Sequence, residues 1–102
     1  MDTHDLLDSI DKGLDPFGSN YKQMIYWNLL ATYRASSGEV IISDPEAFGR
    51  AIEELSGSRA ERIEQSIIRE VRKTFGLSIQ ESRNIVSTIQ AAKEILVNYS
   101  PL

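Results

Sequence analysis

The first fifteen residues carry five aspartates, and carboxylates at short spacing are the side chains from which proteins build sites for hard cations. A calcium-binding loop needs oxygen ligands at its first, third and fifth positions and a glycine at its sixth. With Asp8 as the first ligand, the third position is Ile10, so this pattern fails. Spacing by three instead places Asp5, Asp8 and Asp11 along one edge of a helix. We therefore expect a solvated acidic edge and no metal site.

Residues that could serve together as catalytic nucleophile, base and orienting group do not occur in this chain. His4 is the only histidine, and the absence of cysteine excludes thiol catalysis, disulfides and thiolate zinc sites. Glu53 and Glu54 are adjacent, and adjacent side chains point about 100° apart on a helix, which does not make a general acid–base pair. We therefore expect a protein that is not an enzyme and that needs no cofactor.

Basic residues gather in the segment from Ser58 to Phe75, where four of them fall within an arc of about 80° on a helix, roughly opposite its apolar side. Ser66 lies on the same stripe, so the sequence predicts a continuous polar ridge. Three glutamates reduce the surplus of this segment to +2 (five basic minus three acidic), and the whole chain has a net charge of −4. A solvated face with surface ion pairs is the favoured interpretation, and a nucleic-acid-binding ridge is the alternative. The four basic residues are Arg59, Arg62, Arg69 and Lys73.

The segment from Tyr21 to Tyr33 has apolar residues around nearly its whole circumference in helical projection. Two explanations fit: a central helix that contacts several neighbours, or a core helix with an exposed apolar outer face. Central burial is favoured, because one helix of a small bundle must contact several others. Tyr26 and Trp27 are still the best candidates for an exposed protein-binding anchor, since aromatic residues dominate interface hot spots. Ile95, off the main apolar stripe of the last helix, is a further candidate.

Hydrophobic periodicity and caps divide the chain into five helical segments joined by short loops. The expected ranges are 5–12, 20–35, 45–56, 59–75 and 79–97. Asp44 suits the N-cap of the third segment, with Pro45 at its first helical position. The other three of the last four segments are preceded by pairs with capping-box spacing. These pairs are Asn20 with Gln23, Ser58 with Glu61, and Ser78 with Glu81.

The segment Glu39 to Ser43 is the only one that could be extended, and it is too short to form a sheet of its own. We expect Val40 and Ile42 to plug the bundle from a loop. The predicted fold class is all-α: a compact bundle of four to five short helices in a single domain, residues 1–102, with 1–4 and 98–102 frayed. The chain has no signal-like N-terminus and no apolar run of about 20 residues, so we expect a cytoplasmic protein with no membrane partner.

Several residues at helix ends and in the helices follow one another in a characteristic order over about Leu14 to Leu77. They are Gly18, Lys22 and Gln23, then Tyr26 and Trp27, then Pro45, Glu46 and Phe48, then Gly57, and finally Phe75 to Leu77. In this order they resemble the small archaeal family called the Nitrosopumilus output domain. The chain departs from the family pattern at Phe17, where the family has an aliphatic residue, and at Ser56, where it has a large apolar one.

The resemblance implies a domain found alone or at the end of archaeal signalling proteins, without known chemistry. It favours a non-enzymatic protein–protein interaction module that acts alone or as a homodimer, with an unidentified protein partner. The alternative hypothesis is a small nucleic-acid-binding regulator that uses the basic ridge.

Overall fold

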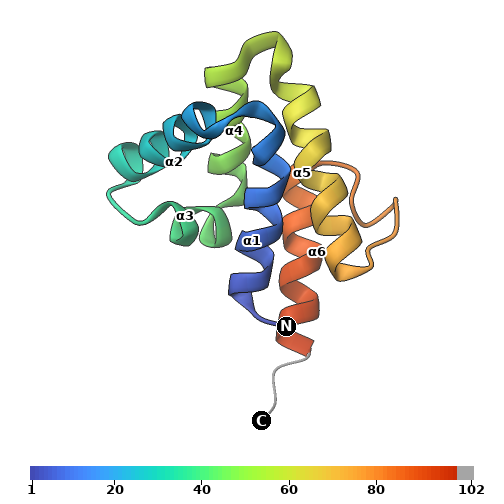
Figure 1. Ribbon diagram of the computed structural model, residues 1–102. Helices are drawn as coiled ribbons and strands as arrows, with labels where there is room; N and C mark the ends of the chain where they lie inside the picture. The colour runs from blue at the N-terminus through green and yellow to red at the C-terminus, as the bar shows by residue number, and fades with distance from the viewer. Residues whose placement is uncertain (99–102) are drawn as a thin grey trace.

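The computed structural model describes residues 1–98, and within this range the chain is all-α, as predicted (Figure 1). The chain has five longer helices and one short helix, α3 (Ser37–Ser43), within the described residues. Two single-turn 3-10 helices, Asp15–Phe17 and Gly57–Arg59, lie in the connections. The five longer helices are α1 (Thr3–Leu14), α2 (Ser19–Tyr33), α4 (Pro45–Ser56), α5 (Ala60–Phe75) and α6 (Ile85–Asn98). None of the helices in residues 1–98 is long and apolar enough to cross a membrane.

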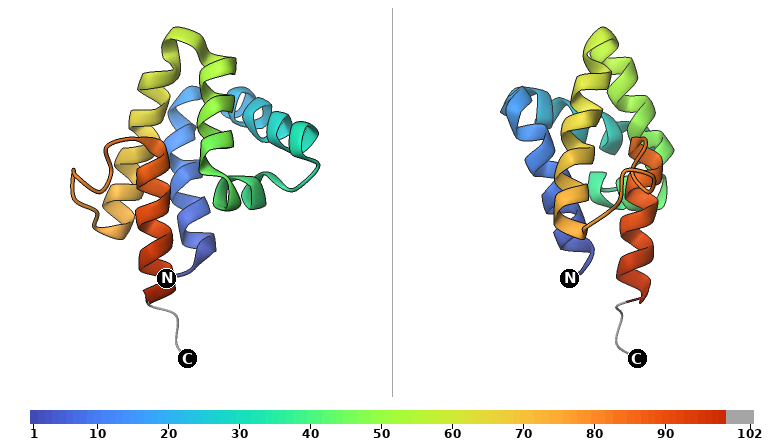
Figure 2. Two further views of the ribbon diagram at one scale, coloured as in Figure 1. Left: turned by 180° about the vertical axis from the view of Figure 1, so that it is seen from behind. Right: turned by 90° about the vertical axis from the view of Figure 1, so that its right-hand side faces the viewer.

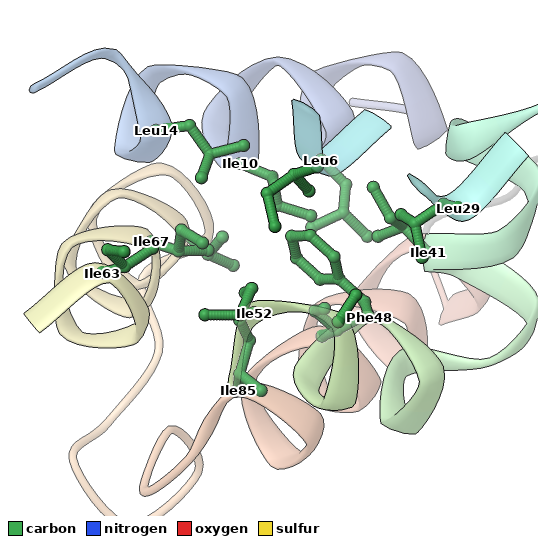
Figure 3. Close-up of a cluster of buried hydrophobic side chains, with 14 of the residues drawn as sticks. Leu6, Ile10, Leu14, Leu29, Ile41, Phe48, Ile52, Ile63, Ile67 and Ile85 are labelled. Atoms are coloured by element: carbon green, nitrogen blue, oxygen red, sulfur yellow. The ribbon is translucent and has the colours of Figure 1, made fainter. Parts of the chain in front are cut away.

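Helices α1, α4, α5 and α6 form a block, and α2 with α3 lies against one side of it (Figure 2). Phe48 from α4 is fully buried near the centre of the core, where α1, α2, α3 and α4 converge (Figure 3). Figure 3 also shows Leu6, Ile10 and Leu14 of α1 lining the core opposite Ile52. The amphipathic stripes of α1, α4 and α5 thus meet in one apolar cluster.

Helices α1 and α5 approach each other closely at Gly13. A Cβ placed on Gly13 would lie 2.5 Å from the Cα of Ile67, so only glycine fits there. Beside it, the Ser66 hydroxyl donates a 2.7 Å hydrogen bond to the Gly13 carbonyl. Ser66 therefore faces α1 and is half-buried, and the predicted continuous polar ridge along α5 is wrong at this position.

The first helix begins earlier than predicted because its N-terminus is capped. The carboxylate of Asp5 accepts from the backbone N–H of Asp2 at 2.8 Å, and that of Asp2 accepts from the N–H of Asp5 at 3.1 Å. This reciprocal capping box starts α1 at Thr3, inside the range 1–4 that was expected to be frayed. At the other end, α6 reaches Asn98, and the remainder of the predicted frayed range, 99–102, lies outside the described residues.

Asp44 caps α4 as predicted, and its carboxylate accepts from the backbone N–H of Ala47 at 3.2 Å. The predicted boxes at Asn20 and Ser58 are wrong. Helix α2 follows Gly18, whose φ of 94° turns the chain sharply, and α5 continues directly from a 3-10 turn. In neither helix does a side chain cap the first turn.

The predicted box of Ser78 and Glu81 forms, but it closes a turn and not the start of the last helix. The hydroxyl of Ser82 donates to the Ser78 carbonyl at 2.6 Å and accepts from Arg72 Nε at 2.8 Å. These bonds hold the backbone in a local turn that competes with the helix. Helix α6 starts only at Ile85, so Ile79, which was expected to begin the last helix, lies outside it and is 73% exposed.

Residues 39–43 are helical, so the expectation of a loop or an extended segment there is wrong. The Ser36 hydroxyl accepts from the backbone N–H of Glu39 at 3.2 Å and caps α3. Val40 and Ile41 are buried, while Ile42 is half-buried. Burial of two adjacent residues fits a short helix, whereas a strand would bury alternate positions.

Candidate protein-binding surface

Helix α2 packs on one side only, so the favoured prediction that it is the central helix is wrong. Its buried residues are Tyr21, Ile25 and Leu29, which recur every four residues and form one stripe. Because α2 lies at the side of the block (Figures 1 and 2), its neighbours bury this stripe and leave the opposite side of the helix exposed. Phe48 and the apolar stripes of α1 and α4 fill the central position instead.

The side of α2 that faces solvent is apolar. Met24 is 42% exposed, Trp27 69%, Leu30 42% and Tyr33 40%. Each of these residues lies three positions after the one before, so consecutive members are neighbours and the set covers about half of the helix circumference. They are four of the seven large apolar side chains that are exposed among residues 1–98. We call this set the outer α2 face.

Within α2 the outer face carries no charge, and the nearest cations, Arg34 at the C-cap and Arg50 beside Tyr33, lie at one end of it. The only charged residue in the fifteen of α2 is Lys22, although 25% of the chain is charged. The Lys22 ammonium bonds to Asp11 Oδ2 at 2.9 Å and to Asp15, and both carboxylates come from the preceding segment of chain. The bonds raise the pKa of Lys22, with the hydrogen bonds to Asp15 and Asp11 as the main cause. Lys22 thus secures α2 to α1 and takes no part in the exposed face.

Tyr26 and Trp27, predicted together as an exposed pair, have different environments. The Tyr26 hydroxyl donates a 2.8 Å hydrogen bond to Asp11 Oδ1, and its ring is half-buried. Burial and the neighbouring Asp11 carboxylate raise the pKa of Tyr26 well above its ordinary range. The expectation that Tyr26 is exposed is therefore wrong, because its polar end faces α1, while Trp27 points outward.

An open groove runs beside Trp27, between α2 and the beginning of α3. The Tyr26 ring and Leu30 give it an apolar lining, and Gln23 with two serines adds polar groups. Sequence reasoning missed this groove, since it exists only where α3 comes to lie next to α2. The residues that line it are Gln23, Tyr26, Trp27, Leu30, Ser36 and Ser37.

Ile95, the third predicted protein-binding residue, is not part of this surface. It is half-buried and packs against the core. It belongs to α6, and both views in Figure 2 place α6 and α2 on different sides of the molecule. The structure therefore does not bring Ile95 together with Trp27.

The four basic residues predicted along α5 are all exposed. Lys73 pairs with Glu70 at 3.3 Å, and the guanidinium of Arg59 lies 6.0 Å from the centre of the Tyr21 ring. In the part of the chain that the structure describes, Arg62 and Arg69 have neither an ion pair nor an aromatic contact. With Ser66 turned toward α1, these two arginines are the open cations of the ridge.

The N-terminal aspartates are occupied by protein contacts. Asp5 closes the capping box, Asp8 pairs with Lys12 at 3.6 Å, and Asp11 and Asp15 bind Lys22. Among residues 1–98, no group of three His, Cys, Asp or Glu side chains is placed to hold a metal ion.

Comparisons with protein-family models, with curated proteins and with solved structures found no match. The resemblance to the Nitrosopumilus output domain therefore remains a prediction from sequence. The surface chemistry of the chain is what bears on its function.

Proposed function

We propose that this chain is a non-enzymatic protein–protein interaction module that binds its partner through the outer α2 face, with Trp27 as the anchor. The observation that carries this proposal is the 69% exposure of Trp27 on a helix whose one charged residue, Lys22, is bonded to Asp11 and Asp15. Apolar side chains scattered singly over a surface are ordinary, but four that adjoin on one helix are typical of an interaction site.

Burial of Trp27 by a partner provides the driving force for binding. Transfer of a large aromatic side chain out of water is among the strongest single contributions to an interface, and truncation of such an anchor typically costs about 2 kcal/mol or more of binding free energy. The indole N–H needs an acceptor when it is buried. Gln23 and the serines of the groove surround Trp27 with polar groups for the rim of an interface.

The outer α2 face is also preorganised. The Lys22 and Tyr26 bonds to Asp11 fix α2 on α1 from its inner side, and Ile25 and Leu29 anchor it in the core. A partner that binds a fixed helix face does not have to order it first, which reduces the entropic cost of association. By its resemblance to the Nitrosopumilus output domain, we place this interaction in archaeal signalling inside the cytoplasm.

The proposal is tested by a native pull-down from extract of the source cells, with and without nuclease, read out by mass spectrometry. The bait is the wild-type chain, Trp27→Ala, or Ile79→Ala. The last is a matched control, because Ile79 is equally apolar and 73% exposed but lies outside α2. We expect a nuclease-insensitive, stoichiometric protein that Trp27→Ala loses and Ile79→Ala keeps. Equal recovery by all three baits would remove the outer α2 face as the binding site.

A nucleic-acid-binding regulator is the second candidate, and the exposure of Arg62, Arg69 and Lys73 on α5, with Arg59 in the 3-10 turn before it, supports it. It ranks second because Lys73 is paired with Glu70 and the net charge is −4. On this hypothesis, replacing Arg62 and Arg69 together with alanine lowers the affinity for duplex DNA or RNA and flattens its salt dependence. A wild-type chain that binds neither duplex at low salt excludes it.

A further inference from the structure

We infer that the occupant of the outer α2 face is a second copy of this chain, related to the first by a two-fold axis that passes beside Trp27. This inference rests on the proposed function, since it names the partner for the same surface.

The distribution of charge favours a second copy at this face. Two identical chains of net charge −4 repel each other, and the repulsion is strongest where acidic surfaces meet. The outer α2 face has no carboxylate, and Lys22, the one cation of α2, is held by Asp11 and Asp15. The cations near this face, Arg34 and Arg50, lie at its Tyr33 end, so the part around Trp27 can meet its own copy without placing like charges opposite each other.

The geometry of an isologous interface also requires that a projection and the recess that receives it lie on the same patch. Trp27 is the most exposed residue of the outer α2 face, and the groove that it borders runs between α2 and α3 on the same side. A two-fold axis beside Trp27 moves the indole of each copy over the groove of the other. Leu30 and the edge of the Tyr26 ring then contact the indole, and Gln23 and Ser36 lie at the rim.

Tyr26 is suited to this position because its hydroxyl is already bonded to Asp11 at 2.8 Å. The ring can be covered by a second copy without leaving an unpaired hydroxyl in the interface. The Asp11 carboxylate, which accepts this bond, also pairs with Lys22, and it lines the neighbouring hollow and not the groove itself.

The size of the surface sets the strength of the dimer. A fifteen-residue helix is roughly 22 Å long and about 10 Å wide, which is smaller than the patch of about 800 Å² per partner that a standard interface buries. We therefore expect a reversible dimer that dissociates on dilution, and not an obligate one.

Trp27 is the single tryptophan of the chain, so its fluorescence reports on this surface alone. The experiment combines sedimentation equilibrium with tryptophan emission and acrylamide quenching of the purified chain over a dilution series. We expect the mass to fall from two copies to one on dilution while the emission shifts to the red and quenching increases. Leu30→Glu, which places a carboxylate near its symmetry mate, weakens the dimer at least tenfold, as does Trp27→Ala measured by sedimentation. Ile79→Ala has no effect.

A chain that stays monomeric at every concentration, with solvent-exposed emission throughout, overturns the second-copy inference. A dimer that survives both Trp27→Ala and Leu30→Glu also overturns it, because the contact must then lie on another face. The proposed function has a separate test: a monomeric chain can still capture a different protein from extract in a Trp27-dependent way. Circular dichroism of each variant confirms that the loss of mass does not come from unfolding.

Discussion

The two helices that follow each other at the N-terminus, α1 and α2, are attached to the molecule in different ways. Helix α1 meets α5 so closely that Gly13 admits no side chain, and its apolar stripe is fully buried. Helix α2 contributes only three buried residues and is held to α1 by polar bonds from Lys22 and Tyr26. Helix α1 is therefore part of the core, whereas α2 exposes one side to solvent and is held to α1 by polar bonds.

This difference explains why apolar residues are found on both sides of α2. The stripe of Tyr21, Ile25 and Leu29 is sufficient to anchor the helix in the core. None of the four outer side chains belongs to the core cluster, so their apolar character is not needed to fill the core. The comparison therefore predicts large losses of stability at α1, α4 and α5, and small losses at the outer α2 face.

Phe48→Ala has the largest expected effect. Phe48 is fully buried in the core, and removing a buried phenylalanine ring typically costs about 3–5 kcal/mol of the free energy of unfolding. Urea denaturation followed by circular dichroism measures the loss, with Ile79→Ala as the exposed control. A loss below about 1 kcal/mol would contradict the central position of Phe48.

Gly13→Ala tests the close approach of α1 and α5. The new Cβ would lie 2.5 Å from Ile67 Cα, and backbone atoms cannot move aside as a side chain can. We expect a net loss of about 2 kcal/mol, because the strain exceeds the roughly 1 kcal/mol that alanine gains over glycine within a helix. Gly38→Ala is the matched control: its Cβ would meet only the tip of Leu7 at 3.0 Å, which can shift. Equal effects from the two substitutions would mean that α1 and α5 are less tightly packed.

Ser66→Ala distinguishes a helix contact from a solvent-facing ridge. The substitution removes the 2.7 Å hydrogen bond to the Gly13 carbonyl and deprives that acceptor of its donor from α5. The expected loss is about 1 kcal/mol in the urea midpoint analysis. Arg62→Ala, one turn away and exposed, serves as the control and should change stability by less than about 0.5 kcal/mol. If Ser66→Ala leaves the free energy of unfolding unchanged, the prediction of a continuous solvent-facing ridge on α5 is favoured again.

The polar bonds that hold α2 to α1 make the stability of the fold depend on pH, whereas the apolar contacts of the core do not. Burial acts to raise the pKa of Asp11, but the hydrogen bonds from Lys22 and Tyr26 prevail and hold it below its ordinary 3.8. A lowered pKa means that Asp11 stabilises the fold above pH 3.8 and that this contribution is lost as the pH falls through the folded value. The raised pKa values of Lys22 and Tyr26 act oppositely, so their contributions are present below about pH 10 and are lost in stronger base.

Asp11→Asn should therefore flatten the acid limb of stability. Because Asp11 and Lys22 are partly exposed, we expect the difference between wild type and variant to stay below about 1 kcal/mol at neutral pH and to vanish in acid. Urea midpoints measured from acid to neutral pH give the slope, and Asp8→Asn, which alters a pair on the surface of α1 alone, is the control. Parallel curves for wild type and Asp11→Asn would show that α2 does not depend on this bond.

The sequence predicts best where apolar residues lie on one side of a helix. Phe48, Ile52, Ile63 and Ile67 recur at helical spacing within the expected segments 45–56 and 59–75, and all four are fully buried. In α2 the periodicity is absent, and the pattern cannot say which apolar side faces the core, because that depends on where α1 and α3 lie. Local hydrogen bonds caused the other errors, as at Ser82, where a side chain holds a turn in place of the predicted helix start.

The candidate site likewise contains residues that the sequence pattern predicts and residues that depend on how the helices pack. Trp27 could be predicted as a binding residue from the sequence. Aromatic residues are frequent interface anchors, so Trp27 was a candidate whichever side of its helix faced the core. Leu30 and Ser36 could not, since the groove that they line arises from the placement of α3, a helix that the sequence did not predict.

Trp27→Ala has the smallest expected effect on stability and the sharpest consequence for the comparison. With 69% of its side chain exposed, Trp27 contributes little to the fold of one chain, so we expect a change below about 0.5 kcal/mol in the free energy of unfolding of the dilute protein. The same substitution should abolish association through the outer α2 face. Phe48→Ala, in contrast, should reduce both properties together, because an unfolded chain presents no α2 face. A large loss of stability from Trp27→Ala at high dilution would mean that Trp27 supports the core after all, and α2 would then be a structural helix like α1.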